Sequence, residues 1–401
     1  MSNMVNKKVL YFTNLFPFFD DLQGGSFLTN RLKEMKSIGL SFKVYGIIPD
    51  DTLLVKMLKK RSGKKIYDAS YTHFETEGIN YEYLSIKRNI FNVFKERLQR
   101  EKTFLEYNDL IFNEIYNDIK NEDFQLIHAH GMYEPPAGLL AKHFSEKLKI
   151  PYIITCHGSD INYKMALTPK LYIDTFEQAA KVIFVSNAIL NKAKSYGYSG
   201  KNAVIIPNGV NIDLFKMLDK EKIKQELHLT KKVVGFVGNL LPVKRADQLP
   251  EIFEEINQNF ETDFLIIGEG RLKNKIEKDC KKKKLNVTFT GKLSHEKIPY
   301  YLNAMDGLIL PSRNEGFPCV VLEAQACGVP VVGSNNGGIS EAIGEGGIVV
   351  NEGENFEKRF ADAVIKILEK PIDKNFLRNR ATEYSWDNIV KKELEIYQNI
   401  S

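Results

Sequence analysis

The chain has 401 residues, enough for roughly two to three domains, and its 43% hydrophobic and 27% charged residues are typical of a globular protein with full apolar cores. The formal charge of +5, from 56 lysines and arginines against 51 aspartates and glutamates, is too small to indicate a nucleic-acid-binding protein. The four cysteines show no metal-ligand spacing and are too few for a secreted disulfide scaffold, so the sequence favours a reducing, cytoplasmic compartment.

The first predicted element is a buried strand over residues 9–12. Lys7 and Lys8 precede a hydrophobic run that ends at Phe19, a pattern that a secretory signal also shows. Asn14 and Pro17 interrupt this run, however, and no small-residue cleavage site follows it. The sequence also contains no run of 18 apolar residues that would span a membrane.

Short apolar runs alternate with longer amphipathic segments along the whole chain. The runs predicted as strands are residues 9–12, 42–48, 126–128, 152–155, 182–185, 204–206, 233–237, 264–267, 287–290, 307–310 and 329–332. Helices are predicted between them, among others over residues 27–38, 136–147 and 298–304. This alternation predicts an α/β fold with parallel sheets covered by helices on both faces.

The turn signal at Pro207-Asn208-Gly209 predicts a domain boundary. We therefore expect an N-terminal α/β domain over residues 1–208 and a C-terminal α/β domain over residues 209–383. The amphipathic C-terminal segment, residues 384–401, is predicted to contain a helix that packs back on the first domain, with Trp386 as its anchor.

Two segments of the first half combine basic and apolar residues. Residues 53–67 hold six lysines and arginines, including Lys64 and Lys65, and no acid. Residues 91–102 add two phenylalanines and four more basic residues. Such segments suit the surface of an anionic membrane, although a solvated helix or a mobile loop gives the same pattern.

The stretch from Leu310 to Gly328 indicates a ligand site. A strand is predicted to end at Leu310, and Pro318 stands where the first residue of the next helix is expected. The free N–H groups at a helix N-terminus bind anions, and open α/β sheets bind ligands at the carboxyl ends of their strands.

Two glutamates lie in this stretch, Glu315 in the loop and Glu323 in the helix, eight positions apart. A carboxylate accepts hydrogen bonds from neighbouring hydroxyls of a sugar or a ribose, so the pair would suit the two ends of a nucleotide-sugar. Glutamate is also an ordinary residue of loops and helices, and the spacing alone does not decide between these interpretations.

This stretch resembles the E-x7-E element of glycosyltransferase family 4, and more precisely that of bacterial polysaccharide-biosynthesis glycosyltransferases. Further pieces resemble the family in the same order along the chain: His157-Gly158-Ser159-Asp160, Ile206–Val210, Val234–Lys244, Phe264–Gly270, Val287–Leu310 and Val329–Val349. The resemblance covers nearly the whole chain and implies the GT-B fold, in which two Rossmann-like parallel-sheet domains face each other across a cleft. It also implies a retaining transferase that uses a nucleotide-diphosphate sugar, most often a UDP-sugar.

The resemblance further implies the residues that bind the donor. Lys244 would contact the diphosphate and stabilise the charge that develops on the leaving phosphate. Glu315 would contact hydroxyls of the donor sugar, and Glu323 the ribose. The backbone around three residues would line the sugar and diphosphate: Gly316, Phe317 and Pro318.

The sequence departs from the family at one point of this site. Asn239 occupies the position where the family usually has an arginine that pairs with the lysine. Arg245 directly follows Lys244 and is the candidate for the second positive charge.

In the first half, His157 follows a predicted strand and would face the reacting carbon, where a neutral imidazole can orient the donor sugar or the acceptor. Gly24 and Gly25 precede a predicted helix, and small residues there allow the backbone to approach a phosphate or the acceptor closely. The predicted catalytic residues are therefore His157, Lys244 and Glu315.

No metal or other cofactor is expected, because a basic residue and a helix N-terminus can neutralise a diphosphate. His128 and His130 share one strand face, but the sequence offers no third ligand nearby, and no Asp-x-Asp stretch lies in a plausible position. No carboxylate stands out as a nucleophile, which favours attack of the acceptor on the front face of the donor sugar.

The acceptor is less defined than the donor. The basic segments favour a lipid-linked saccharide in capsule, exopolysaccharide or cell-wall polysaccharide synthesis, with peripheral contact at the cytoplasmic membrane face. The alternative is a small soluble acceptor. A sugar-nucleotide epimerase and a non-catalytic sugar-nucleotide-binding protein are the two other hypotheses, against which the E-x7-E element and the retained Lys244 and His157 argue.

Overall fold

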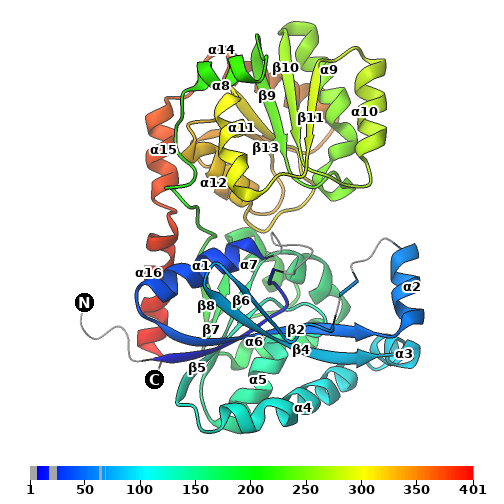
Figure 1. Cartoon of the computed structure of the whole chain (residues 1–401), viewed down its shortest axis with the longest axis vertical. Helices are drawn as coiled ribbons and strands as arrows, with labels where there is room; N and C mark the ends of the chain where they lie inside the picture. The colour runs from blue at the N-terminus through cyan, green and yellow to red at the C-terminus, as the bar shows by residue number, and fades with distance from the viewer. Residues whose placement is uncertain (1–6, 18–24, 63–65, 68, 401) are drawn as a thin grey trace. The chain divides into compact units, whose positions relative to one another are not determined.

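A computed structural model describes residues 7–17, 25–62, 66–67 and 69–400 (Figure 1). Gly24, Lys64 and Lys65, which the sequence pattern singled out, lie outside these residues. The chain divides into two compact units, one of Met1–Ile206 with Val390–Ser401 and one of Pro207–Ile389. Among the described helices, none is both long enough and apolar enough to cross a membrane.

The first unit is built on an eight-stranded sheet in the order β3-β4-β2-β1-β5-β6-β7-β8, in which β3 pairs with β4 antiparallel and all other pairs are parallel. Its strands are β1 (Lys8–Thr13), β2 (Ser41–Asp51), β3 (His73–Thr76), β4 (Ile79–Arg88), β5 (Phe124–His130), β6 (Tyr152–Cys156), β7 (Lys181–Phe184) and β8 (Ala203–Ile205). Its helical segments are α1 (Ser26–Ser37), α2 (Leu53–Arg61), α3 (Ile90–Leu98), α4 (Arg100–Ile119), α5 (Ala137–Leu148), η1 (Asp160–Lys164), η2 (Met165–Leu167), α6 (Pro169–Gln178) and α7 (Asn187–Ser195).

Successive side chains of the central strands point to opposite faces of this sheet. Phe12 packs on Phe144 of α5, with ring centroids 4.7 Å apart. Its neighbour Tyr11 points to the opposite face, where its hydroxyl lies 3.6 Å from the sulfur of Met35 in α1. Because successive strand residues point to opposite faces, helices cover both sides of the sheet, as the sequence predicts.

The second unit has a six-stranded, fully parallel sheet in the order β11-β10-β9-β12-β13-β14. Its strands are β9 (Lys232–Val237), β10 (Thr262–Ile267), β11 (Val287–Gly291), β12 (Gly307–Leu310), β13 (Val331–Ser334) and β14 (Gly347–Val350). Its helical segments are α8 (Lys220–Glu226), η3 (Pro242–Lys244), η4 (Ala246–Gln248), α9 (Leu249–Asn259), α10 (Lys273–Lys282), η5 (His295–Lys297), α11 (Ile298–Ala304), α12 (Cys319–Ala326), α13 (Ile339–Ile343), α14 (Phe356–Glu369) and α15 (Lys374–Thr382).

The core of the second unit lies between its sheet and helices α9 and α14. Phe236 and Phe264 of adjacent strands are fully buried there with Phe253 of α9 and Phe360 of α14. Phe253 stacks on Phe264 with ring centroids 4.1 Å apart. These apolar strands end at one sheet edge, so the loops that follow β9, β10 and β12 are supported by a closely packed core.

The C-terminal helix α16 (Trp386–Asn399) begins in the second unit and ends in the first. Trp386 lies against Gly209, where a Cβ atom would be 2.7 Å from the indole ring. The buried contacts with the first unit are instead made by Glu393, whose Oε2 lies 2.8 Å from Nη1 of Arg31, and by Tyr397. Trp386 thus packs on Gly209 of the second unit, and its role as the anchor of the helix stays a prediction.

Three strands were not predicted from the sequence: β3, β4 and β14. The helix expected to start at Pro318 begins one residue later, at Cys319, and Pro318 is its N-cap with ψ 112°.

Candidate functional site

Lys244 and Glu315 meet at the carboxyl edge of the second sheet. Lys244 ends the turn η3 that follows β9, and Glu315 lies in the loop between β12 and α12. The ammonium Nζ of Lys244 donates to Oε1 of Glu315 at 2.5 Å. Neighbouring parallel strands deliver both loops to the same edge, because β9 pairs directly with β12.

Backbone contacts hold these two loops together. The N–H of Arg313 donates to the carbonyl oxygen of Val243 at 2.8 Å, and its guanidinium donates to the carbonyl oxygen of Pro242. From the other side, the N–H of Gly338 donates to the carbonyl oxygen of Glu315 at 3.1 Å. The geometry of the Lys244–Glu315 pair is therefore set by the backbone of both loops, and Arg313 is a supporting residue that the sequence pattern did not indicate.

Glu323 has a partner that sequence reasoning missed. Its Oε1 lies 2.9 Å from Nε2 of His295, which is in the turn η5 after β11. The ring of His295 also packs edge-on against Phe215 at 5.0 Å. The only signal in the sequence was a histidine shortly after a predicted strand, which is too common a pattern to select it.

Asn239 is exposed in the loop after β9. Glycines allow this loop to lie close to the turn after β10. The N–H of Gly238 donates to the carbonyl oxygen of Ile267 at 2.9 Å, and the N–H of Leu240 donates to that of Glu269 at 2.9 Å. At Gly268, which has φ +139°, a Cβ atom would lie 2.0 Å from the carbonyl oxygen of Gly238. Only glycine permits this approach, which holds the Asn239 loop against the turn after β10.

Arg245 pairs with a carboxylate other than Glu315. Its Nη2 lies 2.5 Å from Oε1 of Glu352, and its guanidinium lies 3.9 Å from the centroid of the Phe356 ring. Its Nε and Nη1 are buried and have no hydrogen-bond partner among the described residues. The structure thus brings Lys244 and Glu315 together but gives Arg245 a different carboxylate.

The backbone of the loop before α12 is held by the side chain of Phe317. The ring of Phe317 is buried and stacks on that of Tyr384, with ring centroids 5.9 Å apart. The backbone carbonyl oxygen of Phe317 accepts a hydrogen bond from Nδ2 of Asn208 at 3.0 Å. The side chain therefore fixes the loop, and the backbone from Gly316 to Pro318 remains the part that suits a ligand.

In the first unit, His157 directly follows β6. Its Nε2 lies 3.2 Å from Nδ1 of His130, and its ring packs on Phe27 at 4.8 Å. Phe27 is in the first turn of α1, whose N-cap is Gly25 with φ +67°. A Cβ atom at Gly25 would lie 2.7 Å from the backbone of Leu15, so glycine is required for the chain to pass there.

The turn that carries His157 is organised by Asp160. Its buried carboxylate accepts from the backbone N–H groups of Gly158 at 2.8 Å, Ile161 at 3.0 Å and His157 at 3.2 Å. Burial raises the pKa of Asp160, and these backbone donors oppose that rise. Burial, together with the charge of Arg31, lowers the pKa of His157 well below its usual value. A neutral imidazole at neutral pH follows, as the proposed orienting role requires.

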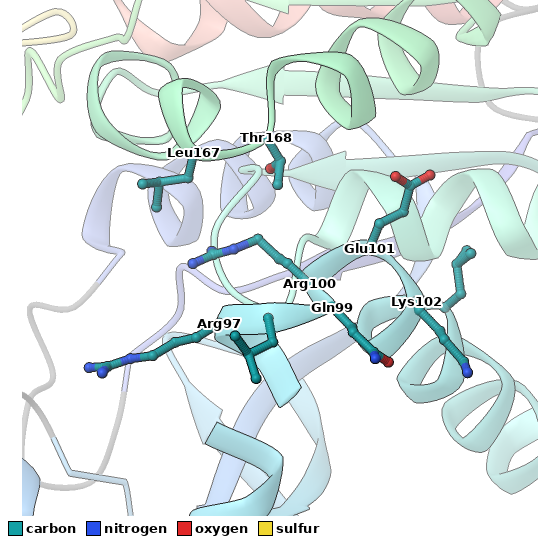
Figure 2. A pocket seen from close by; sticks show the side chains of 9 residues that line it. Arg97, Gln99, Arg100, Glu101, Lys102, Leu167 and Thr168 are labelled. Atoms are coloured by element: carbon teal, nitrogen blue, oxygen red, sulfur yellow. The ribbon is translucent and has the colours of Figure 1, made fainter. Parts of the chain in front are cut away.

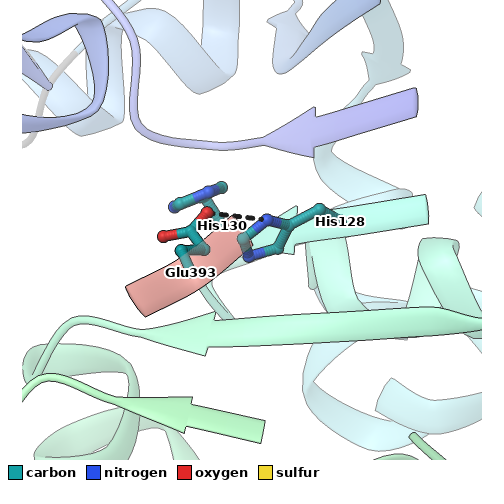
Figure 3. Close-up of side chains that lie close together, drawn as sticks. All are labelled: His128, His130 and Glu393. Atoms are coloured by element: carbon teal, nitrogen blue, oxygen red, sulfur yellow. Dashed lines mark ion pairs between the residues drawn. The ribbon is translucent and has the colours of Figure 1, made fainter. Parts of the chain in front are cut away.

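A third potential metal ligand, the carboxylate of Glu393, lies near His128 and His130, contrary to the expectation from sequence (Figure 3). Glu393 reaches both histidines from the C-terminal helix, far away in the sequence. The nitrogens of His128 already contact the hydroxyls of Tyr397 at 2.6 Å and Thr155 at 2.8 Å. Glu393 likewise contacts Arg31 and Tyr397, so a metal at this point would have to displace members of an existing hydrogen-bond network.

The predicted site residues thus fall into two sets. Lys244 and Glu315 are in contact, and the remaining donor-site candidates of the second unit lie in the surrounding loops or, like Glu323, on α12: Asn239, Arg245, Gly316, Phe317, Pro318 and Glu323. His157 and Gly25 belong to the first unit, where Phe27 connects them.

Comparison with known proteins matches both units. The family described as "Glycosyltransferase Family 4" matches residues 76–214, and that described as "Glycosyl transferases group 1" matches residues 219–385. The chain is 28% identical to "Putative teichuronic acid biosynthesis glycosyltransferase TuaC" of Bacillus subtilis, over 84% of this chain and 83% of that protein. It is 27% identical to N-acetyl-alpha-D-glucosaminyl L-malate synthase of Bacillus anthracis, over 84% of this chain and 92% of that protein.

Among solved structures, the Anabaena protein Alr3699/HepE in complex with UDP superposes with a TM-score of 0.71. The match covers 98% of this chain and 100% of that one at 18% identity, so it shows a shared fold.

Proposed function

We propose a donor, an acceptor class and a mechanism for this chain. It belongs to glycosyltransferase family 4 and has the GT-B fold, with two α/β units that are each built on a mainly parallel sheet. It transfers a sugar from a nucleotide-diphosphate sugar, with UDP as the favoured carrier, to a lipid-linked saccharide. The anomeric configuration is retained and no metal ion takes part. The observation that supports this proposal most strongly is the Lys244–Glu315 pair at the carboxyl edge of the second sheet.

In the proposed reaction, Lys244 and Glu315 contact different parts of the donor. The ammonium group of Lys244 binds the diphosphate and stabilises the negative charge that develops when the glycosidic bond breaks. Glu315 accepts hydrogen bonds from the donor sugar and fixes its orientation, while Glu323 binds the ribose. The backbone between Gly316 and Pro318 lines the diphosphate and sugar.

The acceptor hydroxyl attacks from the side of the leaving diphosphate, whose oxygen takes the hydroxyl proton as the new bond forms. His157 is neutral at neutral pH and orients the donor sugar or the acceptor by a hydrogen bond. In the proposed mechanism, the positive charge that a metal supplies elsewhere comes from Lys244. Arg245 adds a more distant charge and stays with Glu352.

The names of the relatives support two acceptor classes. TuaC is named for teichuronic acid biosynthesis, which favours a saccharide acceptor in cell-wall polysaccharide synthesis. The N-acetyl-alpha-D-glucosaminyl L-malate synthase of Bacillus anthracis is named for L-malate, and a small soluble acceptor is therefore the second candidate.

The test supplies labelled UDP-, GDP- and dTDP-sugars together with either a host lipid extract or a panel of small hydroxy acids. We expect label from one donor in the organic-soluble fraction, with the same anomeric configuration in donor and product. The Glu315→Gln variant should lose the transfer, whereas Glu261→Gln, at an exposed glutamate of the same unit, should retain it. Label in a small soluble product would assign the second acceptor class. An isomerised free nucleotide-sugar without any transfer would contradict the proposal and favour an epimerase.

A further inference from the structure

We propose that α2 and α3 together form a docking surface for an anionic membrane. The docking surface consists of seven exposed apolar side chains and the cations around them: Leu53, Leu54, Met57 and Leu58 of α2, and Phe91, Phe94 and Leu98 of α3. The inference rests on the proposed function only in assigning the surface to the delivery of a lipid-linked acceptor. Membrane binding itself follows from the surface and is tested separately below.

The sheet places α2 and α3 side by side. They directly follow β2 and β4, which are neighbouring parallel strands whose last residues, Asp51 and Arg88, lie in register. Both helices therefore begin at the same edge of the sheet (Figure 1). Segments separated by about thirty residues of sequence thus start from neighbouring positions on the sheet.

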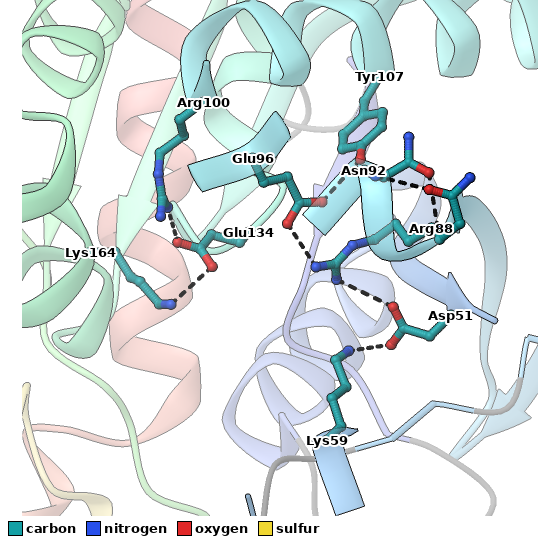
Figure 4. Close-up of polar contacts among 10 residues, drawn as sticks. Asp51, Lys59, Arg88, Asn92, Glu96, Arg100, Tyr107, Glu134 and Lys164 are labelled. Carbon is teal, nitrogen blue, oxygen red and sulfur yellow. Dashed lines mark hydrogen bonds and ion pairs between the residues drawn. The ribbon is translucent and has the colours of Figure 1, made fainter. Parts of the chain in front are cut away.

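A polar network beneath the helices fixes their position (Figure 4). Asp51 pairs with Lys59 of α2 and with Nη1 of Arg88 at 3.6 Å. Nη2 of Arg88 lies 2.7 Å from Glu96 of α3, and Glu96 accepts from the hydroxyl of Tyr107 at 3.0 Å. The one acid of α3 is thereby turned inward against an arginine.

The outer faces of these helices are apolar and uncovered. Leu98 is 81% exposed, Leu53 76% and Phe91 74%. No residue of α3 is buried, and in α2 only Val55 is. In the whole described part of the second unit only three large apolar side chains are exposed, Met217, Leu218 and Phe376. Such a concentration of exposed Leu, Met and Phe on two nine-residue helices indicates an interaction surface.

The accessible charge on the docking surface has one sign. The helices carry Lys56, Lys60 and Arg61 in α2 and Lys95 and Arg97 in α3, and none of these pairs with a carboxylate among the described residues. Glu96 is occupied by Arg88. Apolar side chains surrounded by cations match the interface of a bilayer that contains anionic lipids. A second copy of the same surface would meet it with like charges, so a membrane is the better partner.

An open hollow of about 640 Å³ extends the docking surface at the start of α4 (Figure 2). Its lining holds three cations, one acid and three leucines: Arg97, Arg100, Lys102, Glu101, Leu98, Leu105 and Leu167. Arg100 pairs with Glu134, which Lys164 also contacts at 3.1 Å, so the carboxylate is neutralised from both sides (Figure 4). The hollow combines cations with leucines, which suits a lipid phosphate and the adjoining part of its chain.

The docking surface lies at the same sheet edge as His157. In the sheet order, β6, which precedes His157, is three strands from β2 and four from β4. At about 4.8 Å per strand, the histidine is offset across the sheet by roughly 15 to 20 Å from β2 and β4. Strand β2 also continues to Asp51, beyond Gly46, which is the last of its residues paired with β1, so α2 begins further out in the strand direction.

The experiment measures co-sedimentation of the full chain with vesicles of phosphatidylcholine alone and with vesicles that also contain phosphatidylglycerol. We expect binding to the anionic vesicles only, and release by high salt. The triple variant Leu53→Ser/Phe91→Ser/Leu98→Ser should bind at least tenfold more weakly. Lys60→Gln/Arg61→Gln should lose about fivefold for each charge removed. Phe376→Ser replaces an exposed phenylalanine of the second unit and should bind like the unmodified chain.

The inference is overturned if the unmodified chain does not sediment with anionic vesicles, or if the triple variant sediments as well as it does. The first result would favour a protein partner for this surface. Nucleoside-diphosphate binding by the same samples, measured without vesicles, distinguishes the two proposals. A chain that binds vesicles but binds no nucleoside diphosphate would contradict the proposed function and leave the docking surface standing. The triple variant should bind nucleoside diphosphate as the unmodified chain does, which also shows that it is folded.

Discussion

The proposed transfer chemistry is centred on the contact between Lys244 and Glu315. Both side chains are mostly buried, and both loops are held by backbone hydrogen bonds, so the ammonium group has a fixed position before a donor arrives. A preorganised charge stabilises a transition state without reorganisation, which is the largest single contribution in many active sites.

We therefore predict that Lys244→Met lowers kcat by about a hundredfold to a thousandfold, because the leaving diphosphate loses its fixed cation. Nucleoside-diphosphate release measures the effect. Lys232→Met is the matched control, since Lys232 is a half-exposed lysine at the opposite end of β9 that pairs with Asp306 at 3.4 Å. Equal losses in both variants would show that Lys244 has no special role.

The buried histidines make the stability of the first unit depend on pH. Burial lowers the pKa of both His128 and His130 well below its usual value. The folded state then keeps them neutral, while the unfolded chain binds protons below about pH 6.5. The free energy of unfolding is thus highest above that pH and falls as the pH drops, by up to about 1.4 kcal/mol per pH unit for each histidine.

His130→Asn removes one of these groups. Between about pH 6.5 and 5.5, the fall in the free energy of unfolding that His128 and His130 cause together should therefore be roughly halved. Urea unfolding at several pH values measures this slope. His73→Asn, at an exposed histidine, is the control for the substitution itself. A slope that is the same in His130→Asn and the unmodified chain would contradict the assignment.

Among the structural elements, the loop at Gly337 has the closest connection to the site. Gly337 has φ +59°, and a Cβ atom there would lie 2.1 Å from the carbonyl oxygen of Glu315. An added methyl group would therefore move the loop that carries this glutamate.

We predict that Gly337→Ala lowers kcat/KM by about a hundredfold, the effect expected when a reacting group shifts by about an ångström. Gly353→Ala is the control, because Gly353 also has a positive φ but its nearest non-neighbouring atom would be 3.4 Å away. Both variants carry backbone strain, so only the alanine at position 337 should affect the rate. Comparable rates for the two variants would show that the Glu315 loop tolerates the displacement.

The sequence predicted most of the sheet but missed its less regular strands. The continuous apolar runs of the central strands could be recognised because both faces of a parallel sheet are buried. Strand β4 lies next to the edge strand of the sheet. Its apolar residues alternate with polar ones such as Glu82. Strand β14 is only four residues long and follows glycines. Neither has the uninterrupted apolar run on which the prediction depended.

For the candidate site, the order of the motifs indicated loops that meet at the carboxyl edge of the second sheet but not their side-chain contacts. The pairing of Glu323 with His295 joins segments 28 residues apart, and that of Arg245 with Glu352 joins segments 107 apart. Contacts at such separations depend on how the loops meet at the sheet edge, which local patterns do not specify. Glu393 near His128 was missed for the same reason, since it comes from the far end of the chain.

At the scale of the whole molecule, the two compact units coincide with the two family matches. The match to residues 219–385 falls within the second unit, and that to residues 76–214 falls almost entirely within the first. The second unit carries the proposed donor contacts, and the first carries His157 and the docking surface. Donor chemistry and acceptor delivery are therefore assigned to different parts of one chain.

The most direct test of this account measures nucleoside-diphosphate release from UDP-, GDP- and dTDP-sugars in the presence of EDTA, with the host lipid extract as the source of acceptor. The account predicts release from one donor at the same rate with EDTA and with added Mn²⁺, and loss of that release in Lys244→Met. Release that requires Mn²⁺ would contradict the assignment of the metal's role to Lys244. Release from no donor under either condition would contradict the proposed nucleotide-sugar chemistry itself.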